Sequence, residues 1–299
     1  MTSREDILIN ANELAALLDS QRALPAGAPR TRLLDVRWTL ILPGADGTDG
    51  PSEPVGLADF RAGHIPDAVF VDLDGELAEH GAPEDGRHPL PSFERLQSAA
   101  RRWGLNEGDD VVVYDGGGNL ASARAWWLLR DAGLRVRLLD GSLPAWKRAG
   151  LQLESGEAAV DPGNVVLDSG QLPRLELADV EQFVRDGGAL LDARAGERYR
   201  GEQEPIDPRA GHIPGALNTP TTDNLDAEGF FLDAAALQAR FATAGVRTDA
   251  PVATYCGSGV TAAHNLVALA LAGIDAALYP GSWSQWSNHE LPVATGPEA

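Results

Sequence analysis

The stretch "RAGHIPDAVFVDLDGEL" at Arg61–Leu77 returns later in the chain as "RAGHIPGALNTPTTDNL" at Arg209–Leu225, with the five residues after the shared arginine identical. Two further pairs of blocks keep the same order: "LLDVR" at 33–37 with "LLDAR" at 190–194, and "DGSLPAW" at 140–146 with "PGSWSQW" at 280–286. Matched blocks in one order indicate an internal duplication. The sequence therefore predicts two copies of one domain.

The chain length agrees with a division in two. The protein has 299 residues, about twice the usual size of a single domain. We expect one domain over residues 1–150, a linker over 151–165 and a second domain over 166–299. The linker segment contains the glycine, proline and acidic residues that are typical of a connection between domains.

Each copy alternates buried-strand patterns with helical ones. "RLLDVR" at 32–37 and "DVVVYD" at 110–115 are typical of buried strands, and "RVRLLDG" at 135–141 begins another. Between them, "LASARAWWLLRDAG" at 120–133 has helical spacing and stops at a glycine. This alternation predicts an α/β fold in each half, with a mostly parallel sheet flanked by helices on both faces.

Composition excludes several classes of partner. With 43% hydrophobic and 23% charged residues, the chain is an ordinary globular protein. Its net charge of −20, without a cluster of Lys and Arg, disfavours nucleic acid and anionic membranes. No signal-like segment and no apolar stretch of roughly 18 residues occurs, so we expect a cytoplasmic protein.

Cys256 is the only cysteine. A single cysteine excludes an internal disulfide and fits a reducing compartment. No residues have the spacing of metal ligands, so we expect neither a metal nor another cofactor.

Cys256 lies between an apolar strand pattern and an alanine-rich helical pattern, in "YCGSGVTAAHNLVALALAGI" at 255–274. At such a turn, unpaired backbone N–H groups and the helix dipole favour a thiolate and any anion on its sulfur. Gly257 and Gly259 suit a tight loop whose backbone approaches the reacting atom. The alternative is a small buried hydrophobic residue, which is how most free cysteines behave. Asp115 holds the equivalent position in the first half, so we expect a single active site.

"CGSGVTA" at 256–262, "GHIPGA" at 211–216 and "GSWSQW" at 281–286 resemble the tandem-domain rhodanese and 3-mercaptopyruvate sulfurtransferase family. The resemblance covers nearly the whole chain. In that family the first domain is catalytically empty, and the cysteine of the second cycles through a persulfide. The resemblance therefore implies a sulfurtransferase with two rhodanese-like domains and a persulfide on Cys256.

The residues after Cys256 bear on the sulfur donor. Members that prefer thiosulfate usually have an Arg-Lys pair there, which suits a dianion. Gly257 and Ser258 are neutral, so the resemblance implies 3-mercaptopyruvate as donor and a thiol, a thioredoxin-like protein or cyanide as acceptor. Thiosulfate, with the same persulfide mechanism, is the alternative.

The resemblance also assigns an anion site. "GERYRG" at 196–201 resembles the family segment whose first arginine binds the substrate anion, which implies that role for Arg198. Mercaptopyruvate enzymes often carry a second arginine where this chain has Ile206. Arg209 lies nearby, but its counterpart Arg61 in the empty domain leaves a structural role equally open. The implied substrate-binding loop comprises Gly257, Gly259, Val260 and Thr261.

In the mercaptopyruvate branch, a loop serine is linked through a histidine to an aspartate of the first domain. "VFVDLDGEL" at 69–77 and "GRHPLP" at 86–91 resemble the segments concerned, which implies Asp74 and His88 as partners of Ser258. Such a serine could supply or relay the proton that a departing enolate needs. The alternative is that the histidine and the aspartate only position the loop.

The other histidines and tryptophans indicate structural roles or the edge of the site. His64 and His212 are equivalent in the repeat, so we expect them to be structural, and His264 to be a packed or surface residue. Trp38 resembles a family residue at the entrance to the site. The remaining tryptophans with a readable pattern are expected in the core or the domain interface: Trp126, Trp127, Trp283 and Trp286.

Two other classes compete with a sulfurtransferase. Cysteine-dependent phosphatases end a longer loop with an arginine six positions after the cysteine, and residue 262 here is alanine. A noncatalytic persulfide carrier or interaction module is also compatible with the loop. Arg198 argues against a carrier, because a grip for a small anion implies a free substrate.

Overall fold

The computed structural model describes residues 3–25, 27–41, 53–157, 160–168, 170–247 and 249–297. The first half forms a five-stranded sheet in the order β1 (Leu8–Ile9), β5 (Val136–Leu139), β4 (Asp110–Tyr114), β2 (Thr31–Asp35) and β3 (Ala68–Phe70). The second half forms a four-stranded sheet in the order β7 (Leu217–Asn218), β6 (Ala189–Asp192), β8 (Val252–Tyr255) and β9 (Ala276–Leu278). All pairings between these named strands are parallel.

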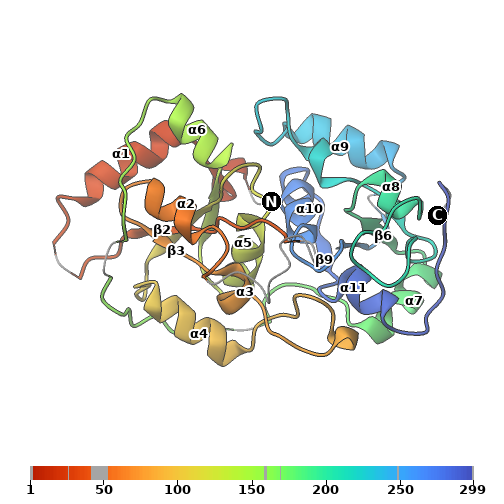
Figure 1. Cartoon of the computed structure of the whole chain (residues 1–299). Coiled ribbons are helices and arrows are strands. Elements are labelled where there is room, and N and C mark those ends of the chain that lie inside the picture. Colours follow the sequence, from red (N-terminus) through yellow and green to blue (C-terminus); the bar gives the residue numbers. More distant parts are fainter. Residues whose placement is uncertain are drawn as a thin grey trace.

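The first half carries the helices η1 (Arg4–Asp6), α1 (Ala11–Gln21), α2 (Leu57–Ala62), α3 (Leu73–Glu76), η2 (Pro83–Asp85), α4 (Phe93–Arg102), α5 (Ser122–Asp131) and α6 (Ser142–Arg148). The second half carries α7 (Leu177–Arg185), α8 (Gly196–Tyr199), η3 (Thr221–Asn224), α9 (Ala234–Thr243), α10 (Ala262–Leu271) and α11 (Ser282–Ser287). Figure 1 shows the two halves side by side, each with helices around its own sheet. None of these helices is long and apolar enough to cross a membrane.

Each sheet buries both faces. Along β4, Val111 and Val113 face one hydrophobic cluster, whereas Val112 and Tyr114 face another that includes residues of α1, α2 and α6. This alternation follows from the two-residue period of a strand. In the second half the outer cluster includes residues of α7, α8 and α11. The predicted α/β fold, with helices on both faces of each parallel sheet, is confirmed.

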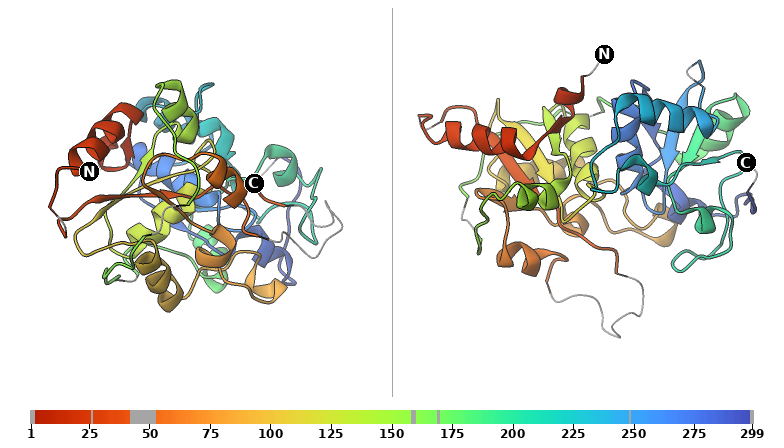
Figure 2. Two further views of the ribbon diagram at one scale, coloured as in Figure 1. Left: turned by 60° about the vertical axis from the view of Figure 1, so that its left-hand side comes forward. Right: turned by 90° about the horizontal axis from the view of Figure 1, so that it is seen from above.

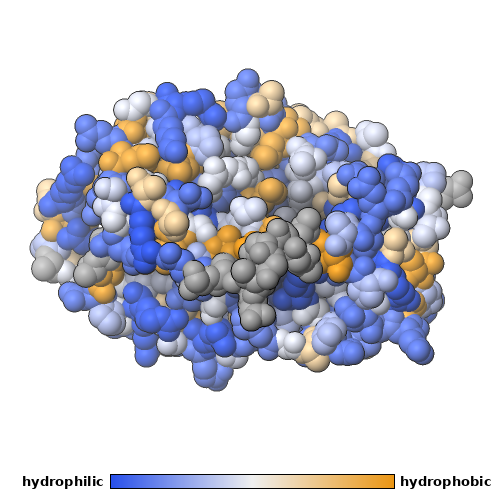
Figure 3. Space-filling model, in the orientation of Figure 1, coloured by the Kyte–Doolittle hydropathy of each residue, from blue (hydrophilic) through white to orange (hydrophobic). Residues whose placement is uncertain are grey.

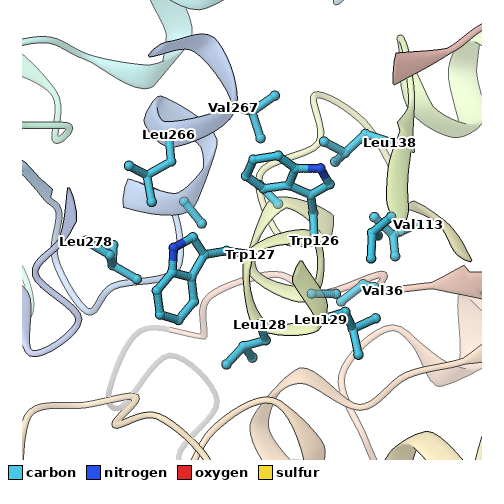
Figure 4. Close-up of a cluster of buried hydrophobic side chains, with 14 of the residues drawn as sticks. Val36, Val113, Trp126, Trp127, Leu128, Leu129, Leu138, Leu266, Val267 and Leu278 are labelled. Atoms are coloured by element: carbon cyan, nitrogen blue, oxygen red, sulfur yellow. The ribbon is translucent and has the colours of Figure 1, made fainter. Parts of the chain in front are cut away.

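The two halves share one hydrophobic core. Helices α5 and α10 pack against each other, and one buried cluster contains side chains from both sheets. Figure 4 shows Trp126 and Trp127 of α5 between Leu266 and Val267 of α10 and the first sheet. Trp126 and Trp127 are therefore interface aromatics, as expected, while Trp283 and Trp286 lie in the outer core of the second half. The right-hand view of Figure 2, from above, again shows the two halves side by side.

The repeated blocks make the same contacts in both halves. Arg37 binds Asp35 and the Gly63 carbonyl oxygen, and Arg194 likewise binds Asp192 and the Gly211 carbonyl oxygen. Each buried salt bridge ties the end of a central strand to the "GHIP" segment.

The two "GHIP" histidines also have matching roles. His64 stacks on Phe60 at 3.9 Å and its Nδ1 contacts the Phe60 carbonyl oxygen at 2.9 Å. His212 stacks on Tyr199 at 3.7 Å, with Nδ1 2.8 Å from the Tyr199 carbonyl oxygen. Both are buried structural residues, in line with the prediction.

The segment between the halves folds back on the first half. The Gly163 N–H donates to the Arg101 carbonyl oxygen, the Val165 N–H donates to the Leu105 carbonyl oxygen, and Leu167 is buried with Val165 in the shared core. The division at residues 150 and 166 stays a prediction. On the face shown in Figure 3, hydrophilic residues cover much of both halves, with apolar residues between them.

Candidate active site

Cys256 follows β8 directly, and the loop from Cys256 to Thr261 leads into α10 at Ala262. The cysteine is only 1% exposed. The Gly259 N–H points at its sulfur, with 3.1 Å between nitrogen and Sγ. Gly259 adopts φ +76°, a left-handed conformation that favours glycine. The loop therefore wraps its backbone around the sulfur atom.

The "PGSWSQW" block supports this loop from the neighbouring helix α11. The Cys256 N–H donates to Ser282 Oγ at 3.1 Å, and the Trp283 N–H donates to the Cys256 carbonyl oxygen at 2.9 Å. The Ser284 N–H donates to the Gly257 carbonyl oxygen at 2.8 Å. The third repeated block thus fixes the backbone of the cysteine and of the next residue.

The equivalent loop in the first half shows what such a turn binds. The Asp115 carboxylate accepts backbone N–H groups of Gly117, Asn119 and Ala121 at 2.9–3.1 Å. In the second half, the corresponding N–H groups of Ser258 and Val260 donate to no group among the described residues. Because backbone N–H groups at a helix start bind anions, the second loop has donors free for an anion next to Cys256.

The structure brings Ser258, His88 and Asp74 into one line across the domain interface. Ser258 Oγ lies 2.7 Å from His88 Nδ1, and His88 Nε2 lies 3.3 Å from Asp74 Oδ1. The Trp38 Nε1–H donates to the other Asp74 oxygen at 2.9 Å, and the Trp38 ring meets the His88 ring edge-on at 5.4 Å. Helix α3 supplies Asp74, and the segment after η2 supplies His88.

The charges of this line follow from burial and hydrogen bonds. Burial lowers the pKa of His88, and the Asp74 carboxylate opposes that shift. Burial acts to raise the pKa of Asp74, but hydrogen bonds from His88 and Trp38 hold it below its usual value. At neutral pH, a neutral imidazole therefore donates Nε2–H to the aspartate, which leaves Nδ1 to accept the Ser258 hydroxyl proton.

A cavity of about 280 Å³ opens beside Cys256. Its lining includes the predicted residues Cys256, Ser258, Arg198, Gly257, Val260 and Thr261, together with Trp38 and Arg87. Gly259 does not line the cavity and contacts Sγ through its N–H instead. A larger cavity of about 590 Å³ lies at the Asp115 loop, and its described lining residues do not include the cysteine, so the smaller cavity is the candidate site.

Arg209 does not reach the cavity. Its guanidinium donates to the backbone carbonyl oxygens of Ser287 at 2.9 Å, Leu291 at 2.8 Å and Trp286 at 2.9 Å, and to that of His289. Arg209 therefore secures the chain after α11. Ile206 lies in the same loop, and its N–H donates to Glu204 at 3.1 Å.

His264 is a packed residue. It is fully buried in α10 and stacks on Phe231 with 4.6 Å between ring centroids. Its Nδ1 lies 3.2 Å from Asn224 Nδ2. These contacts give it a structural place in the second domain, away from the cavity beside Cys256.

Two arginines of the first half reach the site without having been predicted. Arg124 of α5 is fully buried and donates to the carbonyl oxygens of Gly259 at 3.1 Å and His88 at 3.0 Å. Burial lowers the pKa of Arg124 to about 10, while the neighbouring Cys256 acts to raise it. Arg87, the second of the two, binds Asp207 at 2.7 Å.

Sequence patterns offered little signal for these arginines. Arg124 lies in a helix that reads as core, and Arg87 is distinguished only by preceding His88. The carboxylates Glu204 and Asp207, which bind Arg198 at 2.7 and 3.1 Å, were missed for the same reason. Their roles come from contacts between distant segments.

Comparison with known proteins agrees with this architecture. Residues 10–149 and 176–289 match the family model of the rhodanese-like domain. The chain is 45% identical to SseB of Mycobacterium tuberculosis, named as a thiosulfate sulfurtransferase, over 99% of each chain. It is 44% identical to a Pseudomonas aeruginosa protein named as a 3-mercaptopyruvate sulfurtransferase, over 97% of this chain and 98% of that one.

A solved structure shows the same arrangement. The crystal structure of SseA from Escherichia coli matches with a TM-score of 0.77 and 33% sequence identity, over 92% of this chain and 98% of that one. The chain therefore belongs to the rhodanese-like family. Within that family, it is a sulfurtransferase with two tandem domains.

Proposed function

We propose that this enzyme takes sulfur from 3-mercaptopyruvate, holds it as a persulfide on Cys256 and passes it to a thiol, a thioredoxin-like protein or cyanide. The observation that carries the donor assignment is the line from Ser258 through His88 to Asp74 beside the cysteine. The neutral residues Gly257 and Ser258 after the cysteine support it, because they add no cations for a dianion. A single free cysteine suits the cytoplasm as the site of this reaction.

The first half-reaction forms one bond and breaks one bond. The Cys256 thiolate attacks the donor sulfur, a sulfur–sulfur bond forms, and the carbon–sulfur bond breaks with its electron pair going to the pyruvate enolate. The enolate carbon gains a proton and the new persulfide loses one. The products are pyruvate and a persulfide anion on Cys256, and the total charge is unchanged.

Ser258 is placed to handle the proton. Its hydroxyl lines the cavity beside Cys256 and is hydrogen-bonded to a histidine that the Asp74 carboxylate orients. We assign to this line the delivery of a proton to the enolate and the recovery of the proton that the persulfide loses. The free N–H groups of Ser258 and Val260 would stabilise the terminal sulfur anion.

The second half-reaction regenerates the enzyme. A thiol attacks the terminal sulfur, the bond between the two sulfurs breaks, and Cys256 leaves as the thiolate while the acceptor carries away the sulfur and the proton. Cyanide attacks in the same way and leaves as thiocyanate.

Thiosulfate is the second candidate donor, favoured by the name of the Mycobacterium tuberculosis relative. In that reaction the thiolate attacks the outer sulfur and sulfite leaves with the bonding electrons. No carbon is protonated, so the line behind Ser258 would have no chemical task. The two donors therefore differ in their need for the serine hydroxyl.

Ser258→Ala tests the assignment with both donors, and the exposed Ser98→Ala serves as the matched control. We expect Ser258→Ala to lower kcat/KM for mercaptopyruvate by about 10²-fold or more, the lower range for loss of a proton-transfer group, and to spare thiosulfate turnover. An equal loss toward both donors would refute the relay. A wild-type kcat/KM that is higher for thiosulfate than for mercaptopyruvate would overturn the donor assignment.

A further inference from the structure

Two guanidinium groups from different domains converge on the residue after the catalytic cysteine. Arg198 comes from α8 of the second domain, and Arg87 comes from the first-domain segment between η2 and α4. A Cβ atom at Gly257 would lie 3.1 Å from Arg87 Nη2 and 3.5 Å from Arg198 Nη1. Both arginines line the cavity that contains Cys256.

Each arginine binds carboxylates through part of its guanidinium and has further N–H groups without a partner among the described residues. Arg87 donates through Nη1 to Asp207 Oδ1 at 2.7 Å, and its buried Nε has no partner among the described residues. Arg198 donates through Nε and Nη2 to Glu204 and through Nη2 to Asp207 Oδ2. The Nη atoms nearest Gly257 make no hydrogen bond to the described residues. Of these donors, the Arg87 Nε–H is the buried one, and a buried donor without a partner is costly, so it points to a ligand.

Asp207 sets the spacing of the pair. Its two carboxylate oxygens bind one arginine each, and its side chain is only 3% exposed. This carboxylate directly follows Ile206, the position at which the family resemblance led us to expect a second arginine. Asp207 thus holds in place Arg87, a cation that the first domain supplies.

We propose that Arg87 is the second donor-binding cation of this enzyme, and that it grips the anionic group of the sulfur donor together with Arg198. The inference rests on the proposed function for its substrate, an anionic sulfur donor. The donor site then spans both domains, because one arginine of the pair belongs to each. The first domain lacks a nucleophile but supplies part of the binding site.

The charges around the pair explain how it would select a donor. Three arginines, Arg87, Arg194 and Arg198, face three carboxylates in one network: Asp192, Glu204 and Asp207. Since these fixed charges balance, attraction comes from aimed N–H groups rather than from excess positive charge. Two guanidinium groups with free N–H donors match a carboxylate, which accepts such bonds through both oxygens.

Alkylation of Cys256 tests the pair without relying on turnover. Iodoacetate carries a carboxylate and iodoacetamide does not, and Cys256 is the only cysteine, so each rate reports one thiol. We expect Arg87→Gln to lower the ratio of the iodoacetate rate to the iodoacetamide rate about tenfold, the lower range for losing a hydrogen bond to a charged group. Arg198→Gln should lower it similarly, and Arg87→Lys should keep part of it.

Arg148→Gln is the matched control. Arg148 is an exposed first-domain arginine that donates to the Glu228 carbonyl oxygen of the second domain, outside the cavity. The ratio should stay at the wild-type value in this variant. If Arg87→Gln leaves the ratio unchanged, or slows both reagents equally, Arg87 only ties the domains together and the inference is wrong.

Steady-state kinetics separates this inference from the proposed function. With an active wild type, Arg87→Gln should raise the donor KM about tenfold, while the KM of the acceptor stays at its wild-type value. If the wild type is active and Arg87→Gln changes neither the donor KM nor the alkylation ratio, the proposed function stands and the inference about Arg87 is wrong. If the wild type is inactive with both donors but Arg87→Gln still lowers the alkylation ratio, the proposed function is wrong and Arg87 remains an anion-binding residue.

Discussion

His88 connects the two domains at the scale of a single side chain. Its two ring nitrogens contact Ser258 of the second domain and Asp74 of the first. Asp74 opposes the effect of burial on the pKa of His88, through its hydrogen bond first and through its charge second. The relay proposed above requires a neutral imidazole, so we expect it at neutral pH and expect its loss as the pH falls through the pKa of His88.

The titration of His88 gives a direct prediction. Since burial lowers its pKa, the midpoint observed by NMR should lie below 6.5. Asp74→Asn should lower the midpoint further, because the carboxylate raises the pKa that burial lowers. His88→Gln identifies the signal. A midpoint above 6.5 in the wild type, or an upward shift in Asp74→Asn, would contradict the proposed electrostatics.

The candidate catalytic and binding residues were easier to predict from the sequence than the residues that hold them in place. Cys256, Ser258, His88, Asp74 and Arg198 belong to recognisable segments, and the structure places all five around or behind one cavity. The roles assigned to them stay predictions. The supporting residues Arg87, Arg124, Glu204 and Asp207 could not be predicted, because their place depends on how distant segments meet.

The decisive element is the turn from β8 to α10. Gly259 lies in this turn with φ +76°, and a Cβ atom there would overlap the Pro280 carbonyl oxygen. A left-handed conformation costs a non-glycine residue about 1–2 kcal/mol, and the overlap adds to that cost. The loop consequently requires glycine both for its conformation and for the space next to α11.

Gly259→Ala should lower the thermal unfolding midpoint and slow alkylation of Cys256, because the N–H that contacts Sγ is displaced. Gly273→Ala is the matched control, since Gly273 has φ +74° and nothing within 4 Å of an added Cβ. Its effect measures the conformational cost alone. If both variants lose the same stability, the close approach to Pro280 has no energetic weight.

Helix α10 also buries an ionisable group. Burial lowers the pKa of His264 from 6.5 to about 3. Between these values the unfolded chain binds a proton that the folded chain does not. The free energy of unfolding should therefore fall with decreasing pH in this range, by about 1.4 kcal/mol per pH unit from this group.

His264→Gln should reduce the slope of the free energy of unfolding against pH, by up to the contribution of one proton. Urea unfolding of the variant and the wild type at several pH values from 7 downward gives the comparison. Well above pH 6.5 the histidine is neutral in both states, so the two slopes should agree there. Equal slopes below pH 6 would show that His264 binds its proton in the folded protein.

The positions of the strands and helices were largely predictable from the sequence. The pattern at 110–115 became β4 over Asp110–Tyr114, and the helical pattern at 120–133 became α5 over Ser122–Asp131. The helix starts later than its pattern because the Asp115 carboxylate binds the N–H groups of Ala121 and Ser122, which shapes the turn before it. Apolar periodicity does not contain that side-chain contact.

At the scale of the whole molecule, the duplication was visible in the sequence and the interface was not. The candidate active site draws on both domains, because Asp74, His88, Arg87 and Arg124 come from the half that lacks the cysteine. Arg124 is central to this assembly. It joins carbonyl oxygens of the first domain to that of Gly259 in the cysteine loop.

Arg124→Met should therefore destabilise the protein and slow sulfur transfer together. It leaves buried carbonyl oxygens unpaired, at about 1–3 kcal/mol for each group that finds no new partner. Arg148→Met, at the exposed edge of the interface, should change the unfolding midpoint much less. Full activity in a folded Arg124→Met would show that the loop does not depend on this contact.

The central claim is a covalent sulfur intermediate on Cys256 formed from mercaptopyruvate. Intact-protein mass spectrometry after incubation with this donor alone, without an acceptor, tests it most directly. The account predicts a gain of one sulfur atom, located on Cys256 by peptide mapping, removed by cyanide and absent from Cys256→Ser. A wild-type protein that turns over mercaptopyruvate but never gains sulfur on Cys256 would contradict it.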